Sequence, residues 1–321
     1  MDTQLLLSNI TNPTLLFFLL GIVAYLVKSD LEIPPTTIKF ISLYLLFSIG
    51  FKGGQELAHE DLNGQVTLEL LFGMAIASAI PFYAFFLLKE RLGVQNAGAV
   101  AAAYGSVSAV TFVAASSFLE AKALPFSGHM VAIMALMESP AIIVGMVLLM
   151  RYDKENSEGP SLGHMLKHSF TNASVLILIG SLLIGLIADA KQAEGIKPFT
   201  TDIFKGFLAI FLLEMGMVTA ARFGAFRKYG GYVSAMAVAF PLVNGSLVAW
   251  LSGMITHDTG DRFMFAVLAA SASYIAVPAA MRLAAPRADP GLYIPMALGV
   301  TFPFNITVGM PVYLALIMRT P

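Results

Sequence analysis

Cysteine is absent from this chain of 321 residues, and charged residues make up only 12% of it. Without cysteine the chain has no disulfides, no thiolate metal ligands and no thiol chemistry. A soluble domain carries roughly 25% charged residues. A chain that is so poor in charge, and 57% hydrophobic, cannot cover itself with a polar surface. The composition therefore predicts a polytopic membrane protein surrounded by lipid.

Three further absences narrow the function. The net charge of −1 leaves no basic face for a nucleic-acid partner. Residues 1–14 hold neither a basic segment nor a small-residue cleavage site, so we expect no cleaved signal peptide. The histidines all fall in loops or at the ends of apolar segments: His59, His129, His164, His168 and His257. We therefore expect no histidine ligand cluster, no metal site other than a possible sodium site, and no enzyme.

Ten apolar segments are candidates for membrane-spanning helices, each of which needs about 20 residues unless it is short or broken. They are 13–27, 36–51, 66–88, 96–118, 129–150, 173–190, 203–220, 229–255, 262–284 and 292–318. The predicted fold class is an all-α polytopic membrane protein with ten transmembrane helices.

Lys and Arg are roughly twice as numerous in the loops on one side of these segments as on the other. Positively charged loops stay in the cytoplasm. This rule places the loops 28–39, 89–95, 151–172, 221–228 and 285–291 inside. Both chain termini would then lie outside the cytoplasm, with the protein in the plasma (inner) membrane.

Two stretches place glycine, proline and hydroxyl side chains in the middle of apolar segments. They are AAAYGSVSAVTFVAAS at 101–116 and AASASYIAVPAA at 269–280, about half the chain apart. Glycine and proline weaken helices, so we expect spans four and nine to be broken here and to cross near the membrane midplane. Equivalent interruptions in two halves are typical of a transporter's substrate site. The candidates for binding substrate are Gly105, Ser106, Ser108, Thr111, Ser271, Ser273 and Tyr274.

The two halves also match elsewhere at nearly the same offset. Met-Ala-Leu occurs at 134–136 and 296–298, and Val-Gly-Met at 144–146 and 308–310. Each half would hold five spans, an odd number, so the second half must enter the membrane with the opposite orientation. The sequence predicts an N-terminal five-helix repeat (1–150), a short cytoplasmic connector (151–172) and a C-terminal inverted repeat (173–321).

A broken span suits a small anion, because the N-terminus of a half-helix offers free N–H groups and partial positive charge. Serine and threonine hydroxyls can donate to the anion, and their oxygens can also coordinate a hard cation. The alternative is that the small residues only allow close helix packing.

Glu138 is the most suggestive charged residue within a span, because intramembrane carboxylates are rare and default to functional hypotheses. It could neutralise a coupling sodium ion, carry a proton, or have a structural partner. Asn305 is a further polar candidate for coordinating a cation. The predicted sodium ligands are Ser108, Glu138, Ser273 and Asn305. Lys39 and Glu69 lie near span ends and are expected to reach the membrane interface.

Motifs along nearly the whole chain resemble one known family. They are NPTL at 12–15, GFKGG at 50–54, GSVS at 105–108, LE at 119–120, PA at 140–141, MGM at 215–217, AASAS at 269–273 and PRADPGLYI at 286–294. In their order and spacing they resemble the SbtA-type sodium-dependent bicarbonate transporters of cyanobacteria. The resemblance implies inverted five-span repeats, core and gate domains, a homotrimer, and a bicarbonate ion bound where spans four and nine cross. Inward movement of sodium, the coupling ion, would drive import, and no other cofactor is implied.

Three departures from that family stand out. Tyr274 follows Ser273 where the family has aspartate, and Glu138 stands where it also has aspartate. The connector is much shorter than the family's cytoplasmic loop, which bears on a possible PII-like regulator. Tyr274 leaves open a different small anion or carboxylate as substrate, with sodium or proton coupling. An intramembrane enzyme lacks a convergent base, and a receptor would need a longer connector for its signalling domain.

Overall fold

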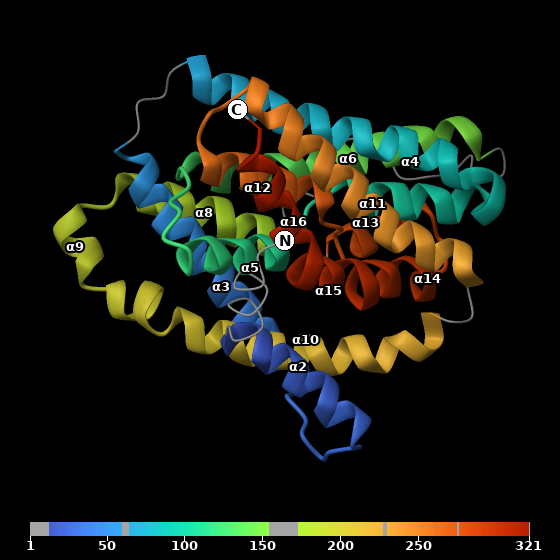
Figure 1. Ribbon diagram of the computed structural model, residues 1–321, viewed down its shortest axis with the longest axis horizontal. Helices are drawn as coiled ribbons and strands as arrows, with labels where there is room; N and C mark the ends of the chain where they lie inside the picture. The colour runs from blue at the N-terminus through green and yellow to red at the C-terminus, as the bar shows by residue number, and fades with distance from the viewer. Residues whose placement is uncertain (1–12, 60–63, 154–172, 227–229, 275, 321) are drawn as a thin grey trace.

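The computed structural model describes residues 13–59, 64–153, 173–226, 230–274 and 276–320, and every regular element in these ranges is helical (Figure 1). Five helical stretches are long and apolar enough to cross a membrane: Gly64–Glu120, His129–Tyr152, Pro198–Ala221, Gly230–Met254 and Pro290–Ile317. Two shorter apolar helices, Leu16–Leu26 and Leu176–Ile187, accompany them. The predictions of an all-helical chain and of a membrane protein are confirmed.

One group of helices consists of two closely packed pairs, which we call the paired-helix group. Its members are α2 (Pro13–Leu26), α3 (Pro35–Leu57), α8 (Ala173–Ile187) and α10 (Phe204–Phe226). Helix α2 packs along α10, as Figure 1 shows, and α3 packs along α8. The short helix α9 (Ala190–Glu194) and the turn η1 (Pro198–Asp202) connect α8 to α10.

Glycines allow both pairs to approach closely. A Cβ built on Gly21 of α2 would lie 3.0 Å from the Met217 nitrogen, and one on Gly216 of α10 would lie 3.0 Å from the Ile22 nitrogen. In the other pair, a Cβ on Gly54 of α3 would lie 2.8 Å from the backbone nitrogen of Leu186. Each Cβ would come closer still to a carbonyl oxygen of the opposite helix, and real side chains do not approach backbone atoms so closely, so these contacts exist only because the residues are glycine.

The remaining helices form a second group around the two hydroxyl-rich stretches, which we call the broken-helix group. They are α4 (Gly64–Gly105), α5 (Ala109–Glu120), α6 (His129–Tyr152), α11 (Gly230–Leu251) with η3 (Ser252–Met254), α12 (Thr259–Ala270) and α13 (Ala276–Ala284), followed by α14 (Pro290–Pro295), η4 (Met296–Thr301), α15 (Phe302–Phe304), η5 (Asn305–Gly309) and α16 (Met310–Ile317). Helix α4 packs against α6, and α11 against α12.

The expected loop at 89–95 is wrong. Helical structure continues on both sides of Gly93, whose backbone alone leaves the helical region (φ 76°, ψ 161°). The chain folds back on itself there (Figure 1), so one residue makes the turn for which a loop was expected. A positive φ is accessible to glycine without steric penalty, which is why a single residue suffices.

Prolines lie inside several helices, and in α11 a side chain compensates for the hydrogen bond that the proline removes. Pro241 has no N–H, so the carbonyl of Ala237, four residues earlier, loses its usual helical partner. The Thr301 hydroxyl donates to that carbonyl at 2.7 Å. The Tyr313 hydroxyl donates to the Pro241 carbonyl, also at 2.7 Å. These bonds fix the last helical stretch, with its two π-turns, against α11.

Candidate functional site

Both hydroxyl-rich stretches break their helices. Helix α4 ends at Gly105 and α5 begins at Ala109, while α12 ends at Ala270 and α13 begins at Ala276. The chain between them is not helical at 106–108 and at 271–274. The predicted interruptions are therefore present at the predicted residues.

The two breaks are bonded to one another. The Ser273 N–H donates to the Ala103 carbonyl at 2.8 Å, and the Ser108 N–H donates to the Ser271 hydroxyl at 3.0 Å. The Ser271 hydroxyl in turn donates to the carbonyl of Leu268 at 2.8 Å. Each break thus supplies partners for backbone groups that the other has freed, which is how irregular backbone is tolerated inside a membrane protein.

Serines cap the half-helices that begin at the breaks. The Ser108 hydroxyl accepts a hydrogen bond from the Thr111 N–H at 3.2 Å at the start of α5. The Ser273 hydroxyl accepts one from the Val277 N–H at 3.4 Å at the start of α13. The first N–H groups of a helix carry partial positive charge. Because α5 and α13 both begin at this crossing, two partially positive helix ends lie there.

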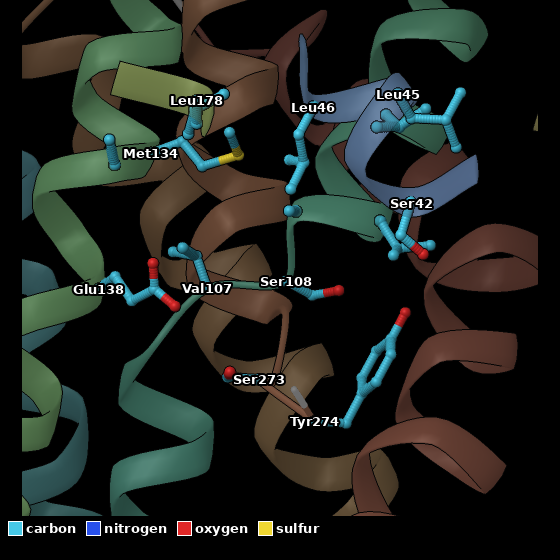
Figure 2. Close-up of a pocket in the computed structure, with 14 residues that line it drawn as sticks. Ser42, Leu45, Leu46, Val107, Ser108, Met134, Glu138, Leu178, Ser273 and Tyr274 are labelled. Carbon is cyan, nitrogen blue, oxygen red and sulfur yellow. The ribbon is translucent and has the colours of Figure 1, made fainter. Parts of the chain in front are cut away.

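A cavity of about 50 Å³ opens beside this crossing (Figure 2). Its polar lining comes from Ser42, Ser108, Glu138, Ser273 and Tyr274, and its walls are otherwise apolar. By the same measure a water molecule needs roughly 10–15 Å³. The cavity therefore has room for a group of a few heavy atoms.

Two of the lining side chains have no hydrogen-bond partner among the residues that the structure describes. The Tyr274 hydroxyl is buried and makes no hydrogen bond among the described residues. In that part of the chain the carboxylate of the half-buried Glu138 likewise forms no hydrogen bond or ion pair. Figure 2 shows Glu138 and Tyr274 on opposite sides of Ser108. Buried polar groups are normally paired, so these two are available to a ligand.

The other predicted site residues lie next to the cavity but do not line it. Gly105 is packed, because a Cβ on it would lie 2.7 Å from Cγ of Pro81. Ser106 is fully buried, and its hydroxyl has no partner among the described residues. Thr111 and Ser271 are used in the bonds described above. The structure thus brings together Ser108, Glu138, Ser273 and Tyr274 of the predicted set.

Asn305 stabilises the break that follows α12. Its Nδ2 donates to the Ala270 carbonyl, the last of that helix, at 2.8 Å. Its Oδ1 lies 3.0 Å from the Tyr313 hydroxyl, whose single proton is directed to the closer Pro241 carbonyl. Asn305 is completely buried and does not line the cavity.

Sequence reasoning missed the part of the cavity that comes from the paired-helix group. Ser42, Leu45 and Leu46 of α3 and Leu178 of α8 form this wall. Their spacing places the α3 residues on one helix face, but nothing in a regular apolar helix indicates which neighbour that face meets. The cavity therefore lies between the two groups of helices.

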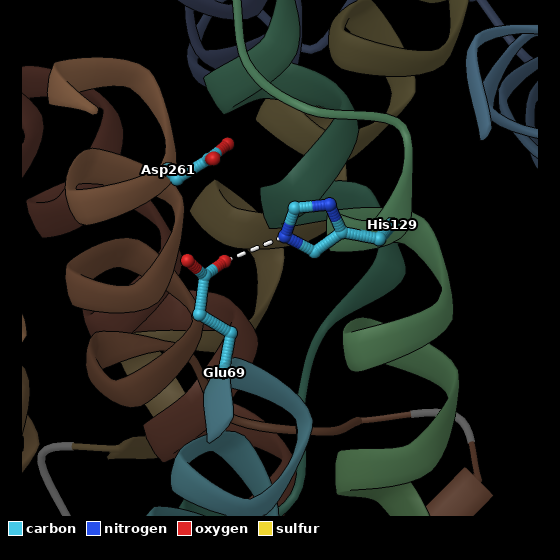
Figure 3. Close-up of side chains that lie close together, drawn as sticks. All are labelled: Glu69, His129 and Asp261. Carbon is cyan, nitrogen blue, oxygen red and sulfur yellow. Dashed lines mark hydrogen bonds and ion pairs between the residues drawn. The ribbon is translucent and has the colours of Figure 1, made fainter. Parts of the chain in front are cut away.

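A second buried polar cluster lies away from this cavity and contains Glu69, His129 and Asp261 (Figure 3). The Glu69 carboxylate bonds to Nε2 of His129 at 2.6 Å. Glu69 is 2% exposed, so the expectation that it reaches the membrane interface is wrong. The expectation that no histidine joins a ligand-type cluster is also wrong, because one ligand atom of each residue lies within 4.8 Å of the others.

Every carboxylate oxygen of this cluster already accepts a hydrogen bond. Gln65 donates to the second oxygen of Glu69 at 2.8 Å. The backbone N–H and the hydroxyl of Ser127 donate to the two oxygens of Asp261 at 2.7 and 2.6 Å. Figure 3 shows the Asp261 oxygens directed away from Glu69. The cluster joins α4, α6 and α12 as a satisfied network.

Comparison with known proteins identifies the family. No curated protein sequence matches the chain. The family model described as the Na+-dependent bicarbonate transporter superfamily matches residues 13–318, nearly the whole chain. With its helix breaks, its membrane-spanning helices and this match, the chain belongs to the Na+-dependent bicarbonate transporter superfamily.

Proposed function

We propose that this protein is a secondary active transporter that imports bicarbonate together with sodium by alternating access. The observation that carries the proposal is a small cavity beside two mutually bonded helix breaks, in which a carboxylate and a hydroxyl have no partner among the described residues. Family membership supports transport of this kind.

The anion would bind at the two capped helix starts. The partial positive charge at the beginnings of α5 and α13 favours negative charge, and the hydroxyls can donate to carbonate-type oxygens. Ser108, Ser273 and Tyr274 would touch it, while Gly105, Ser106, Thr111 and Ser271 would keep the breaks in shape. Bicarbonate has four heavy atoms, which suits a volume of about 50 Å³.

Sodium would bind on the Glu138 side. A hard cation prefers oxygen ligands, which Ser108, Ser273 and Glu138 supply within one cavity. Asn305 would act through the Ala270 carbonyl that it fixes. Sodium would neutralise the Glu138 carboxylate, and anion and cation would stabilise each other, which couples their movements.

Alternating access would move the broken-helix group, as the core, against the paired-helix group, as the gate. The cavity has walls from both groups, so a displacement of one against the other would open it to either side. The proposal includes ten spans arranged as two inverted repeats, at 1–150 and 173–321. Helices α2 and α8 would be equivalent, as would α3 and α10, and the packing of α2 on α10 then mirrors that of α8 on α3.

The proposal also covers the orientation in the membrane, the oligomeric state and a regulator. Both termini would lie outside the cytoplasm, with the connector 151–172 inside, a homotrimer in the plasma (inner) membrane, and a PII-like regulator as a possible partner. Single-cysteine variants in this cysteine-free chain would test the orientation by labelling from each side.

The deciding experiment is uptake of labelled bicarbonate into proteoliposomes with and without an inward sodium gradient. We expect uptake that depends on sodium and is competed by unlabelled bicarbonate. Tyr274, which stands where the family has aspartate, favours a second candidate, a small carboxylate such as formate. Uptake of labelled formate but not of bicarbonate would establish that alternative. Transport of neither by folded protein would refute both.

A further inference from the structure

A second, smaller cavity lies farther along the cleft between α3 and α5. It has a volume of about 40 Å³ and is lined by residues that follow those of the first cavity on the same two helices. On α3 the lining passes from Leu46 to Ser48 and Lys52, and on α5 from Val113 to Ser116 and Glu120. Thr200 and Lys205 close its other side.

The Ser48 hydroxyl is the most informative group in this second cavity. Ser48 is 1% exposed, and its hydroxyl has no hydrogen-bond partner among the described residues. Leaving such a group unpaired lowers the stability of the folded protein. Because the hydroxyl belongs to a side chain that lines the cavity, a ligand with acceptor oxygens could satisfy it.

Three lysines and two glutamates line the cavity and the groove outside it, which leaves a net charge of +1: Lys52, Lys197, Lys205, Glu120 and Glu194. Lys52 is exposed and forms no ion pair within the described part of the chain. Lys205 Nζ lies 3.1 Å from the Glu120 carboxylate across the mouth of the cleft. A surface groove of about 320 Å³ continues outward from Lys52 to Lys197 and Thr201. A net positive charge at a narrow opening, with Lys52 left free of any ion pair in the described residues, raises the local concentration of anions.

Apolar side chains separate the two cavities. Leu46 and Val113 line the first cavity and Ile49 lines the second, and these three residues are 5%, 1% and 7% exposed. The route from the surface groove to the first cavity therefore has a polar, cationic stage followed by an apolar constriction. In the orientation proposed above, the groove faces outward.

We propose that the second cavity is an additional binding site for a small oxyanion, which holds the transported anion before it passes the Leu46–Ile49–Val113 constriction. Lys52 supplies the charge and Ser48 the free hydroxyl donor. The second site lies on the route to the first cavity, so its role in transport rests on the proposed function. Anion binding to the second site can nevertheless be measured without transport.

The experiment uses a thiol placed in the second cavity. The chain contains no cysteine, so Ser116→Cys introduces a unique and nearly isosteric probe. In detergent solution, we expect an anionic methanethiosulfonate reagent to modify this thiol roughly tenfold faster than a cationic one. Millimolar bicarbonate should slow the modification. Adding Lys52→Gln should remove both the charge preference and the protection.

Lys39→Gln is the matched control, because Lys39 is an exposed cation near the other end of the same helix. It should leave both effects in place. The thermal transition of each variant is measured first, and Thr201→Cys, at another residue that lines the second cavity, serves as a second probe position if Ser116→Cys is unstable. Equal rates for the two reagents, or a thiol that bicarbonate does not protect, would overturn the proposal.

Transport separates this proposal from the proposed function. If the second site holds the anion, Lys52→Gln should raise KM for bicarbonate uptake several-fold and leave kcat unchanged. A protected thiol without sodium-driven uptake would retain the second site and refute the transport proposal. Sodium-driven uptake with a thiol that bicarbonate does not protect would retain the transport proposal and refute the second site.

Discussion

The cavity at the helix breaks and the Glu69–His129–Asp261 cluster are both buried, polar and built from several helices, yet their hydrogen bonds differ completely. All four carboxylate oxygens of the cluster accept a hydrogen bond from a neighbour. In the cavity, Glu138 and the Tyr274 hydroxyl have no partner among the described residues.

This difference separates structural from functional polarity. Burying a polar group is tolerated when its hydrogen bonds are made, and the resulting network then stabilises one arrangement of helices. A buried group left without a partner lowers stability unless something else binds to it. We therefore expect substitutions in the cluster to affect folding and substitutions in the cavity to affect transport.

Glu69→Ala should strongly destabilise the protein. It leaves the buried His129 without its carboxylate partner and removes a hydrogen bond from Gln65, and removing one partner of a buried ion pair costs about 3–5 kcal/mol. The measurement is the thermal transition in detergent, compared with wild type. KM for uptake by the folded fraction should not change. A stable Glu69→Ala protein with an altered KM would contradict the assignment of a structural role to the cluster and a functional role to the cavity.

Glu138→Gln should abolish sodium-driven uptake while leaving the thermal transition close to that of wild type, because the carboxylate has no partner to lose among the described residues. We expect a fall in kcat/KM of at least about 100-fold, which corresponds to about 2.7 kcal/mol. Glu214→Gln is the matched control, because Glu214 is also half-buried within an apolar helix but lies outside the cavity. Equal losses in both variants would contradict a specific role for Glu138.

Ser108→Ala should affect both properties moderately. It removes the cap at the start of α5, a loss of about 1 kcal/mol, and it removes a hydroxyl from the cavity. The loss of uptake should be larger than the loss of about 1 kcal/mol in stability alone would explain. Ser127→Ala in the cluster is the comparison, since it also removes a single hydroxyl bond, to Asp261, and should lower the thermal transition without changing KM.

Tyr274→Phe should leave stability unchanged or raise it by up to about 1 kcal/mol, because it removes a buried hydroxyl that has no partner. KM for the anion should rise if that hydroxyl donates to it. Competition by formate and bicarbonate, measured on wild type and variant, shows whether the hydroxyl discriminates between them. A lower thermal transition would instead indicate a structural role for the hydroxyl.

The positions of the breaks could be predicted because glycine, serine and proline inside apolar spans act locally. The cavity wall from Ser42, Leu45 and Leu178 could not, because regular helices give no signal of which face meets which neighbour. Glu69 was misjudged for a related reason: nearness to a span end does not say whether a side chain points to lipid or to another helix. Gly93 replaced an expected loop because one residue with a positive φ can reverse the chain.

The glycine contacts between the paired helices have a consequence for how this sequence can vary. Exchanging glycine for alanine inside a helix usually increases stability by roughly 0.5–1 kcal/mol. At Gly21, Gly54 and Gly216 the added methyl group would instead meet the backbone of the opposite helix. A map of tolerated substitutions would therefore show two separate sets of invariant positions, one at the helix breaks and one along these contacts. The second set would carry no information about the substrate.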